Sequence, residues 1–124
     1  MASGQQVIEF SLKIITSTYT PGPAGSVQVQ VNCEGTATGF GAVLGTATFV
    51  PAGMKHATYS WCGVSYLDNG ESITDQAQGT IESIGPHKWR TQAIDHLSDG
   101  RTMRVEGEAD LAARSWTGKL IAMD

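Results

Sequence analysis

An alternation of apolar and polar residues along almost the whole chain constrains the fold more than any other feature. It is clearest where Val27, Val29, Val31 and Cys33 alternate with polar residues. A period of two residues is typical of a β-strand with one buried face, whereas a helix repeats its apolar positions every three or four residues. The only helix-compatible stretch, Glu108–Ser115, follows a strand-like alternation. The sequence therefore predicts an all-β protein.

Turn-forming residues, mostly Gly, Pro, Asn and Asp, divide the alternating segments into eight predicted strands. The segment Asp68-Asn69-Gly70, for example, is typical of a hairpin turn. The connections are short, which predicts an antiparallel up-and-down meander. The strands are predicted from about Ile8 to the break at Pro21–Gly25, and then at about Val27–Ala37, Ala42–Val50, His56–Leu67, Ser72–Ile84, Lys88–Leu97, Thr102–Leu111 and Ser115–Met123.

A meander of long strands leaves two exposed edges, which closure into a barrel removes. No segment remains to form a covering helix, so the predicted architecture is one closed eight-stranded antiparallel barrel over residues 1–124. A two-sheet β-sandwich is the alternative. A chain of 124 residues can bury a core without help from a metal or a disulfide.

The charge composition excludes several classes of partner. The formal net charge is −4, whereas a nucleic-acid-binding surface needs clustered Lys and Arg. No apolar run approaches the roughly 18 residues that cross a membrane, and no basic segment with a following apolar run predicts a secretory signal. We therefore expect a cytoplasmic protein in which the well-separated Cys33 and Cys62 are reduced. No metal-ligand spacing and no phosphate-binding loop is present, so no cofactor is predicted.

Charged residues are distributed unevenly along the chain. Between Ile14 and Met54 the only acidic or basic residue is Glu34. A sheet face depleted of charge is typical of a contact between subunits. We therefore predict a homo-oligomer that associates through the second and third strands.

In a water-soluble barrel the more apolar face of each strand points inward. Many residues on the inferred inner faces are Gly or Ala, which give room to the three tryptophans, mark tight coiling of the strands, or leave a cavity. The third and fourth strands stay ambiguous because both of their faces are semi-apolar. The predicted inward residues are Val27, Val29, Val31, Cys33, Gly35, Ala37, Ala77, Gly79, Ile81, Trp89, Ala93, Met103, Val105, Gly107, Ala109, Trp116, Gly118, Leu120 and Ala122.

A few polar residues fall on the same inner faces and are the candidate catalytic groups. Asp95 shares a face with Trp89, and Asp75 shares one with Ala77. A carboxyl group in an apolar lumen has a raised pKa and can act as a general acid or base. Tyr59 is the third candidate, since its hydroxyl could polarise a carbonyl group.

Alternatives stay open for several of these side chains. Arg90 or Arg114 could neutralise Asp95, and Asp75 could face solvent at the barrel mouth. From the fourth strand, either Tyr59 with Trp61 or Tyr66 with Cys62 would line the lumen. The residues predicted to contact a ligand are Cys33, Trp61, Tyr66, Trp89, Thr91, Met103 and Trp116.

Three short glycine-containing segments, Gly35–Gly41, Gly79–Gly85 and Gly107–Leu111, carry a resemblance to known proteins. In layout and in these segments the chain resembles the small calycin-type barrels, especially the bacterial barrels related to allene oxide cyclase. The resemblance implies a hydrophobic small molecule bound inside the barrel. It also implies, from some members of the family, cyclisation of a substrate without a cofactor.

Three functional hypotheses follow. The leading one is a lumenal pocket for cofactor-independent isomerisation or cyclisation of an apolar substrate, because a small-residue lumen with few polar groups is typical of a ligand site. The second is a carrier or sensor that binds a hydrophobic molecule without chemistry. The third is a self-assembling structural module whose lumen is filled by Trp61, Trp89 and Trp116.

Overall fold

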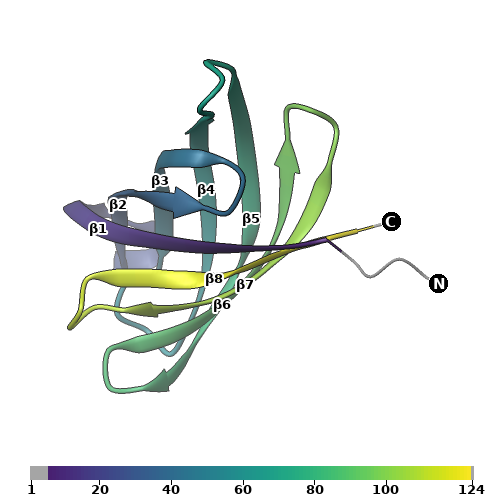
Figure 1. Cartoon of the computed structure of the whole chain (residues 1–124). Helices are drawn as coiled ribbons and strands as arrows, with labels where there is room; N and C mark the ends of the chain where they lie inside the picture. The colour runs from purple at the N-terminus through teal and green to yellow at the C-terminus, as the bar shows by residue number, and fades with distance from the viewer. Residues whose placement is uncertain (1–5, 124) are drawn as a thin grey trace.

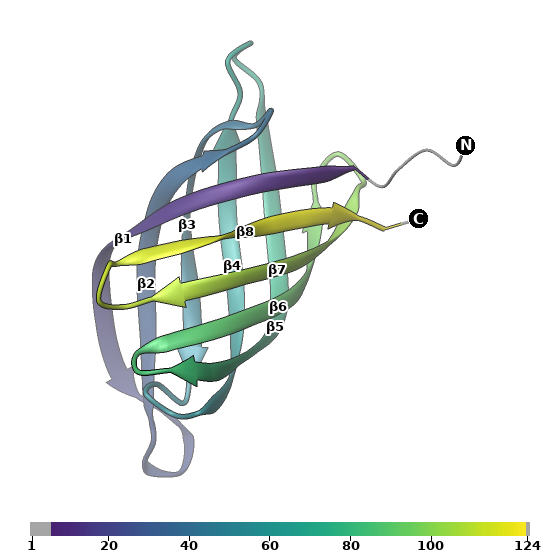
Figure 2. The same cartoon turned by 60° about the horizontal axis from the view of Figure 1, so that its bottom comes forward.

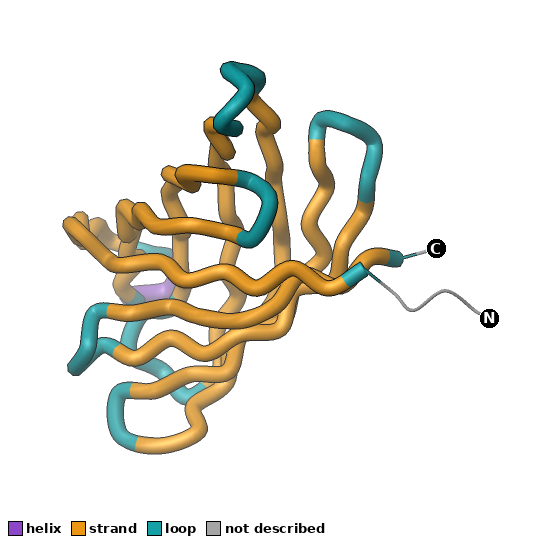
Figure 3. Tube along the Cα trace, in the orientation of Figure 1, coloured by secondary structure: helices purple, strands orange, loops and turns teal. Residues whose placement is uncertain are grey.

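The computed structural model describes residues 6–123, which form eight strands and one short 3-10 helix, η1 (Pro23–Gly25). Figure 3 shows how strand dominates the chain. The strands are β1 (Val7–Pro21), β2 (Val27–Ala37), β3 (Gly41–Val50), β4 (His56–Tyr66), β5 (Ser72–Gly85), β6 (Lys88–Leu97), β7 (Thr102–Asp110) and β8 (Ser115–Ala122). β1 continues to Pro21, where the Pro- and Gly-rich segment of the sequence predicts a break.

Each strand pairs antiparallel with the next, and β8 pairs with β1, so the sheet closes on itself (Figures 1 and 2). The predicted up-and-down barrel is confirmed, and the sandwich alternative is wrong. The up-and-down order sorts the connections onto two ends of the barrel. The terminal end carries both chain ends and the β2–β3, β4–β5 and β6–β7 turns, and the opposite end carries the other four connections.

The β1–β2 hairpin extends beyond the rest of the barrel at the opposite end. Pairing between β1 and β8 covers only Val7–Lys13, whereas pairing between β1 and β2 continues to Pro21. Figure 2 shows β1 bending before the hairpin projects past the neighbouring turns. The second half of β1, from Ile14 to Pro21, therefore has a neighbouring strand on one side only.

A bulge in β1 decides which side chains of this extension face inward. The register shifts between Ile14 and Thr16, which leaves Ile15 as the extra residue. A bulge of one residue reverses the alternation of faces along the strand. As a result Tyr19 shares the inner face with its partner Val29.

The lumen is lined as the alternation predicts. The predicted inward positions with large or medium side chains are buried or partly buried, apart from Val27 at the opposite mouth. At Gly35, Gly79 and Gly118 a β-carbon would meet main-chain atoms of the neighbouring strand. These three glycines therefore permit close approach of strands rather than leave space. In β4 the inner face carries Tyr59 and is the odd-numbered one.

The outer surface of β2 is polar, and that of β3 carries the exposed Leu44 beside threonines. Asn32 donates a hydrogen bond to Thr16 across to β1 and accepts one from Thr46 on β3, at 2.7 Å each. Self-association through this face stays a prediction. Cys33 is buried and Cys62 is exposed on the other face of the sheet, so the two thiols are free and cannot bond to each other. Over the residues described, no helix is long and apolar enough to cross a membrane.

Candidate functional site

An aromatic cluster fills the middle of the lumen and divides it in two. The Trp116 ring lies 5.5–6.3 Å, between centroids, from the rings of Phe10, Phe49, Tyr59 and Trp61. Three of these pairs are edge-to-face, the geometry that aromatic quadrupoles favour. Trp116 lines the cavity on each side of it, so one indole is the partition between two chambers.

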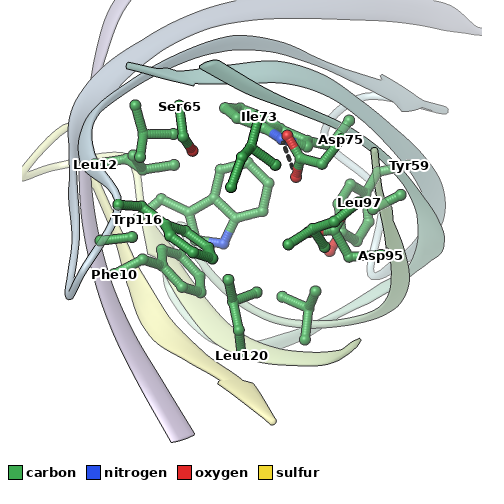
Figure 4. A pocket seen from close by; sticks show the side chains of 16 residues that line it. Phe10, Leu12, Tyr59, Ser65, Ile73, Asp75, Asp95, Leu97, Trp116 and Leu120 are labelled. Carbon is green, nitrogen blue, oxygen red and sulfur yellow. Dashed lines mark hydrogen bonds between the residues drawn. The ribbon is translucent and has the colours of Figure 1, made fainter. Parts of the chain in front are cut away.

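The first chamber, which we call the carboxyl chamber, is drawn in Figure 4, and Phe40 of the β2–β3 turn at the terminal end is among its lining residues. Its walls are apolar except for Ser65, Asp75, Asp95 and the polar atoms of the aromatic residues. Its volume is about 60 Å³. Because one water occupies about 10–15 Å³ on this scale, the chamber has room for roughly four waters or a small organic group.

Two carboxyl groups face each other across this chamber from neighbouring strands. The β5–β6 register pairs Ala77 with Asp95 and Asp75 with Leu97, which makes the two aspartates diagonal neighbours on the inner face. The indole N–H of Trp61 donates a hydrogen bond of 3.1 Å to Asp75 Oδ2 (Figure 4). This bond gives one oxygen of Asp75 a donor inside the barrel.

Burial, and after it hydrogen bonding to Asp75 and the charge of Asp75, together raise the pKa of Asp95 to about 9. Its side chain is only 3% exposed. Neither Arg90, which pairs with Glu82 at 2.7 Å outside the barrel, nor any other arginine neutralises it. The alternative that Arg90 or Arg114 neutralises Asp95 therefore does not apply, and at neutral pH Asp95 is a neutral carboxylic acid in an apolar chamber.

One oxygen of this acid lacks a partner. Asp95 Oδ1 is buried and has no hydrogen bond within the described part of the chain. A buried acceptor left unpaired costs about 1–3 kcal/mol. Nothing in the fold requires this free-energy cost. The unpaired oxygen therefore marks Asp95 as a functional candidate.

A second polar network holds the partition in place. The indole N–H of Trp116 donates a hydrogen bond of 3.1 Å to the fully buried Thr91 hydroxyl. Thr91 also forms a hydrogen bond with the Tyr59 side chain. Burial has the larger effect on the pKa of the phenol and raises it well above its ordinary value, whereas the hydrogen bond by itself lowers that pKa. Tyr59 therefore stays protonated at neutral pH and can donate a hydrogen bond but cannot serve as a base.

Two glycines make room for Trp61. A β-carbon at Gly45 or Gly63 would lie 2.5–2.8 Å from atoms of the Trp61 indole, closer than side chains tolerate. Of the alternatives left open for small residues, room for a tryptophan is the one that applies at Gly45 and Gly63. Both glycines have ordinary negative φ angles, so only the collision opposes a side chain there.

Gly63→Ala is expected to push the Trp61 indole away from Asp75 and to cost about 1–3 kcal/mol through overpacking. Chemical denaturation followed by tryptophan fluorescence measures the loss. Ser60→Ala, on the outer face of the same strand, is the matched control and should change stability by less than about 0.5 kcal/mol. Equal stability of the two variants would contradict this account of Gly63.

The second chamber, which we call the apolar chamber, opens at the opposite end. Its volume is about 320 Å³. No charged residue lines it, and the two indole N–H groups on its walls already donate, Trp89 to the Met54 carbonyl at 3.0 Å and Trp116 to Thr91. The lining residues are Ile14, Ser17, Tyr19, Val27, Val29, Val31, Phe49, Ala52, Gly53, Ile81, Trp89, Ala109, Leu111 and Trp116.

Comparison with known proteins gives no match: no family model, no curated protein and no solved structure matches this chain. The closed eight-stranded antiparallel barrel is compatible with a calycin-like architecture. Among residues 6–123, no group of three or more His, Cys, Asp or Glu side chains could hold a metal ion.

The structure brings half of the ten predicted site residues together. Asp75, Asp95, Tyr59, Trp61 and Trp116 all line the carboxyl chamber. The catalytic candidates thus lie side by side, at the end of the barrel where the chain termini emerge.

The remaining ligand-binding candidates are scattered. Thr91 supports the partition from behind, and Trp89 lines the apolar chamber instead. Cys33 and Met103 are buried in the barrel wall and line neither chamber. The prediction for Tyr66 is wrong, because its side chain is 51% exposed on the outer face of β4.

Several lining residues were missed in the sequence. Leu120 was predicted to face inward but was not named as a ligand contact, and Phe10 lies on a recognisably apolar strand face and could have been found by alternation. Ser65 was hidden by the ambiguous fourth strand. Tyr19 could not be found, because the bulge at Ile15 is not visible in the alternation.

Proposed function

We propose that the protein binds a small, mostly apolar molecule with one polar group in the carboxyl chamber, and that Asp95 acts on it as a neutral acid. The observation that carries the proposal is the unpartnered Oδ1 of a protonated, buried Asp95 beside Asp75. A ligand whose oxygen or nitrogen carries a hydrogen could donate a hydrogen bond to the unpaired Oδ1. A ligand oxygen or nitrogen with a free lone pair could instead accept a hydrogen bond from the acid. Perturbed carboxyl groups in an apolar cavity are typical of catalytic sites.

The reaction type that fits the pair is proton transfer next to a carbonyl group. Asp95 would give its proton to the carbonyl oxygen while the Asp75 carboxylate, held by the Trp61 N–H, takes a proton from the neighbouring carbon. Return of the two protons, with carbon protonated at a different position, yields an isomer. The pair begins and ends with one proton, so no oxidant, reductant or cofactor is required. The resemblance to allene oxide cyclase-like barrels supports the same class of cofactor-independent chemistry.

The test is exchange of carbon-bound hydrogen in a small ketone. Acetone, with four heavy atoms, matches the size of the chamber, and in deuterium oxide the protein should accelerate its deuterium uptake, followed by NMR. Removing a general acid or base costs about 10²–10⁴-fold in rate, so Asp95→Asn and Asp75→Asn should abolish most of the acceleration.

Asp99→Asn is the matched control, because Asp99 is a surface carboxylate paired with Arg101 at 2.7 Å. It should leave the exchange rate unchanged. Exchange no faster than in buffer, or an unchanged rate in both chamber variants, would reject the catalytic proposal.

A carrier without chemistry is the second candidate, and the size and lining of the apolar chamber favour it. It predicts that a ligand raises the melting temperature while no product forms. Native mass spectrometry of protein from its own source would reveal a co-purified ligand and the subunit count together.

A further inference from the structure

The geometry points to a second, separate binding site: we propose that the apolar chamber holds an uncharged aromatic or hydrocarbon group, with Tyr19 forming part of its wall. This site differs from the carboxyl chamber in place, size and chemistry, and does not depend on the reaction proposed there. Its volume of about 320 Å³ falls within the range of about 300–1,000 Å³ that small-molecule pockets occupy.

The chemistry of the walls restricts the occupant. None of the lining residues carries a charge, and both indole N–H donors already have carbonyl or hydroxyl partners. The hydroxyls of Ser17 and Tyr19, both on the projecting hairpin, are the polar side-chain groups left to meet a ligand. An ion placed against these walls would lose its hydration without gaining a partner. An uncharged group loses little and gains contact with Trp89, Phe49 and the far face of Trp116.

The β1–β2 hairpin is shaped to enclose such a group. The hairpin projects past the point where β8 leaves β1, so it forms a wall with no strand on its free edge. The bulge at Ile15 turns Tyr19 onto the inner side of that wall. With regular alternation the threonines at positions 16, 18 and 20 would face the chamber instead. Bulges commonly re-aim side chains beside functional sites.

The mouth of the chamber exposes apolar side chains to solvent. Tyr19 is 63%, Val27 44% and Leu111 41% exposed, and all three line the chamber. An exposed concave apolar surface of this kind marks a binding site more often than a structural void. A bound ring or chain would bury these three side chains together with the interior walls.

The probe that tests the site is N-phenyl-1-naphthylamine, an uncharged fluorophore that brightens in apolar surroundings. We expect binding with an affinity in the micromolar range or tighter. The sulfonated analogue 8-anilinonaphthalene-1-sulfonate has the same rings plus a negative charge, and it should bind at least ten-fold more weakly. Tighter binding of the sulfonate would overturn the assignment to an uncharged ligand.

Variants assign the binding to one chamber. Ala109→Leu fills the apolar chamber from within, and Ala52→Trp blocks it from the partly exposed connection between β3 and β4, where the barrel interior is not disturbed. Each should weaken probe binding at least ten-fold. Ala37→Leu, which fills the carboxyl chamber, is the matched control and should leave it unchanged.

The outcomes separate this site from the one proposed above. Retained binding in a folded Ala52→Trp protein, or binding lost on Ala37→Leu, would overturn the second site. Asp95→Asn should leave probe binding intact whether or not it abolishes hydrogen exchange. Failure of the ketone experiment therefore does not count against the apolar chamber, and failure of the probe experiment does not count against the carboxyl pair.

Discussion

Raising the pH from about 4 to about 9 is expected to weaken the fold, and Asp95→Asn is expected to remove most of that dependence. The pKa of Asp95 is raised in the folded protein, so between these limits the folded state holds a proton that the unfolded chain has released. The free energy of unfolding then falls as the pH rises, at its steepest by about 1.4 kcal/mol per pH unit. The contribution is complete below the unfolded pKa and is lost as the pH passes the folded one.

Urea unfolding at a series of pH values measures the effect, as the difference between the variant and the natural protein at each pH. An amide at position 95 still donates to Asp75 but does not titrate, so Asp95→Asn should be the more stable protein at pH 8, by more than about 2 kcal/mol. Asp99→Asn is the control, because hydrogen bonding to Arg101 lowers the pKa of the exposed Asp99. This substitution should leave the dependence of the free energy of unfolding on pH unchanged between pH 5 and 9. Parallel curves for Asp95→Asn and the natural protein would contradict the raised pKa.

Trp116→Ala is expected to be the most damaging single truncation in the barrel. It removes a side chain that is 3% exposed and contacts four aromatic rings, and it leaves the Thr91 hydroxyl without its donor. Truncation of a buried large aromatic residue costs about 3–5 kcal/mol. Denaturant unfolding measures the loss, and Trp89→Ala, at a more exposed ring, should cost less.

The same substitution would also join the two chambers. A molecule too long for either chamber alone, such as a fluorescent fatty alcohol, should then bind the variant more tightly than the natural protein, provided that the measurement is made well below the denaturation midpoint. A loss of stability under about 1 kcal/mol would show that Trp116 is not the central support of the lumen.

The architecture could be predicted because the alternation is regular over most strands and the turn residues are unambiguous. The inward position of Asp75 and Asp95 follows from the same alternation. Their contact does not, because it depends on the register between β5 and β6. A bulge at Ile84 sets that register and pairs Asp95 with Ala77, and the local sequence gives no sign of it.

Two other features depend on space rather than on sequence pattern. The inner face of β4 was ambiguous because both faces are semi-apolar, and the structure resolves it through the room that Gly45 and Gly63 leave for Trp61. The division of the lumen by Trp116 needs four rings from β1, β3 and β4 to meet one indole from β8. A local sequence pattern cannot predict contacts between strands that are far apart in the chain.

The pairing of Val7 with Ile121 brings the first and last strands side by side at one rim of the barrel. A short peptide linker could therefore join the two ends, and a circularly permuted chain could open instead at the β1–β2 connection, beside the apolar chamber. In the natural order, any tag or fusion partner attached at either end lies near the carboxyl chamber and leaves the opposite mouth clear. For surface-based binding measurements, attachment through a natural terminus therefore leaves the apolar chamber accessible. Attachment through a terminus of the permuted chain leaves the carboxyl pair accessible.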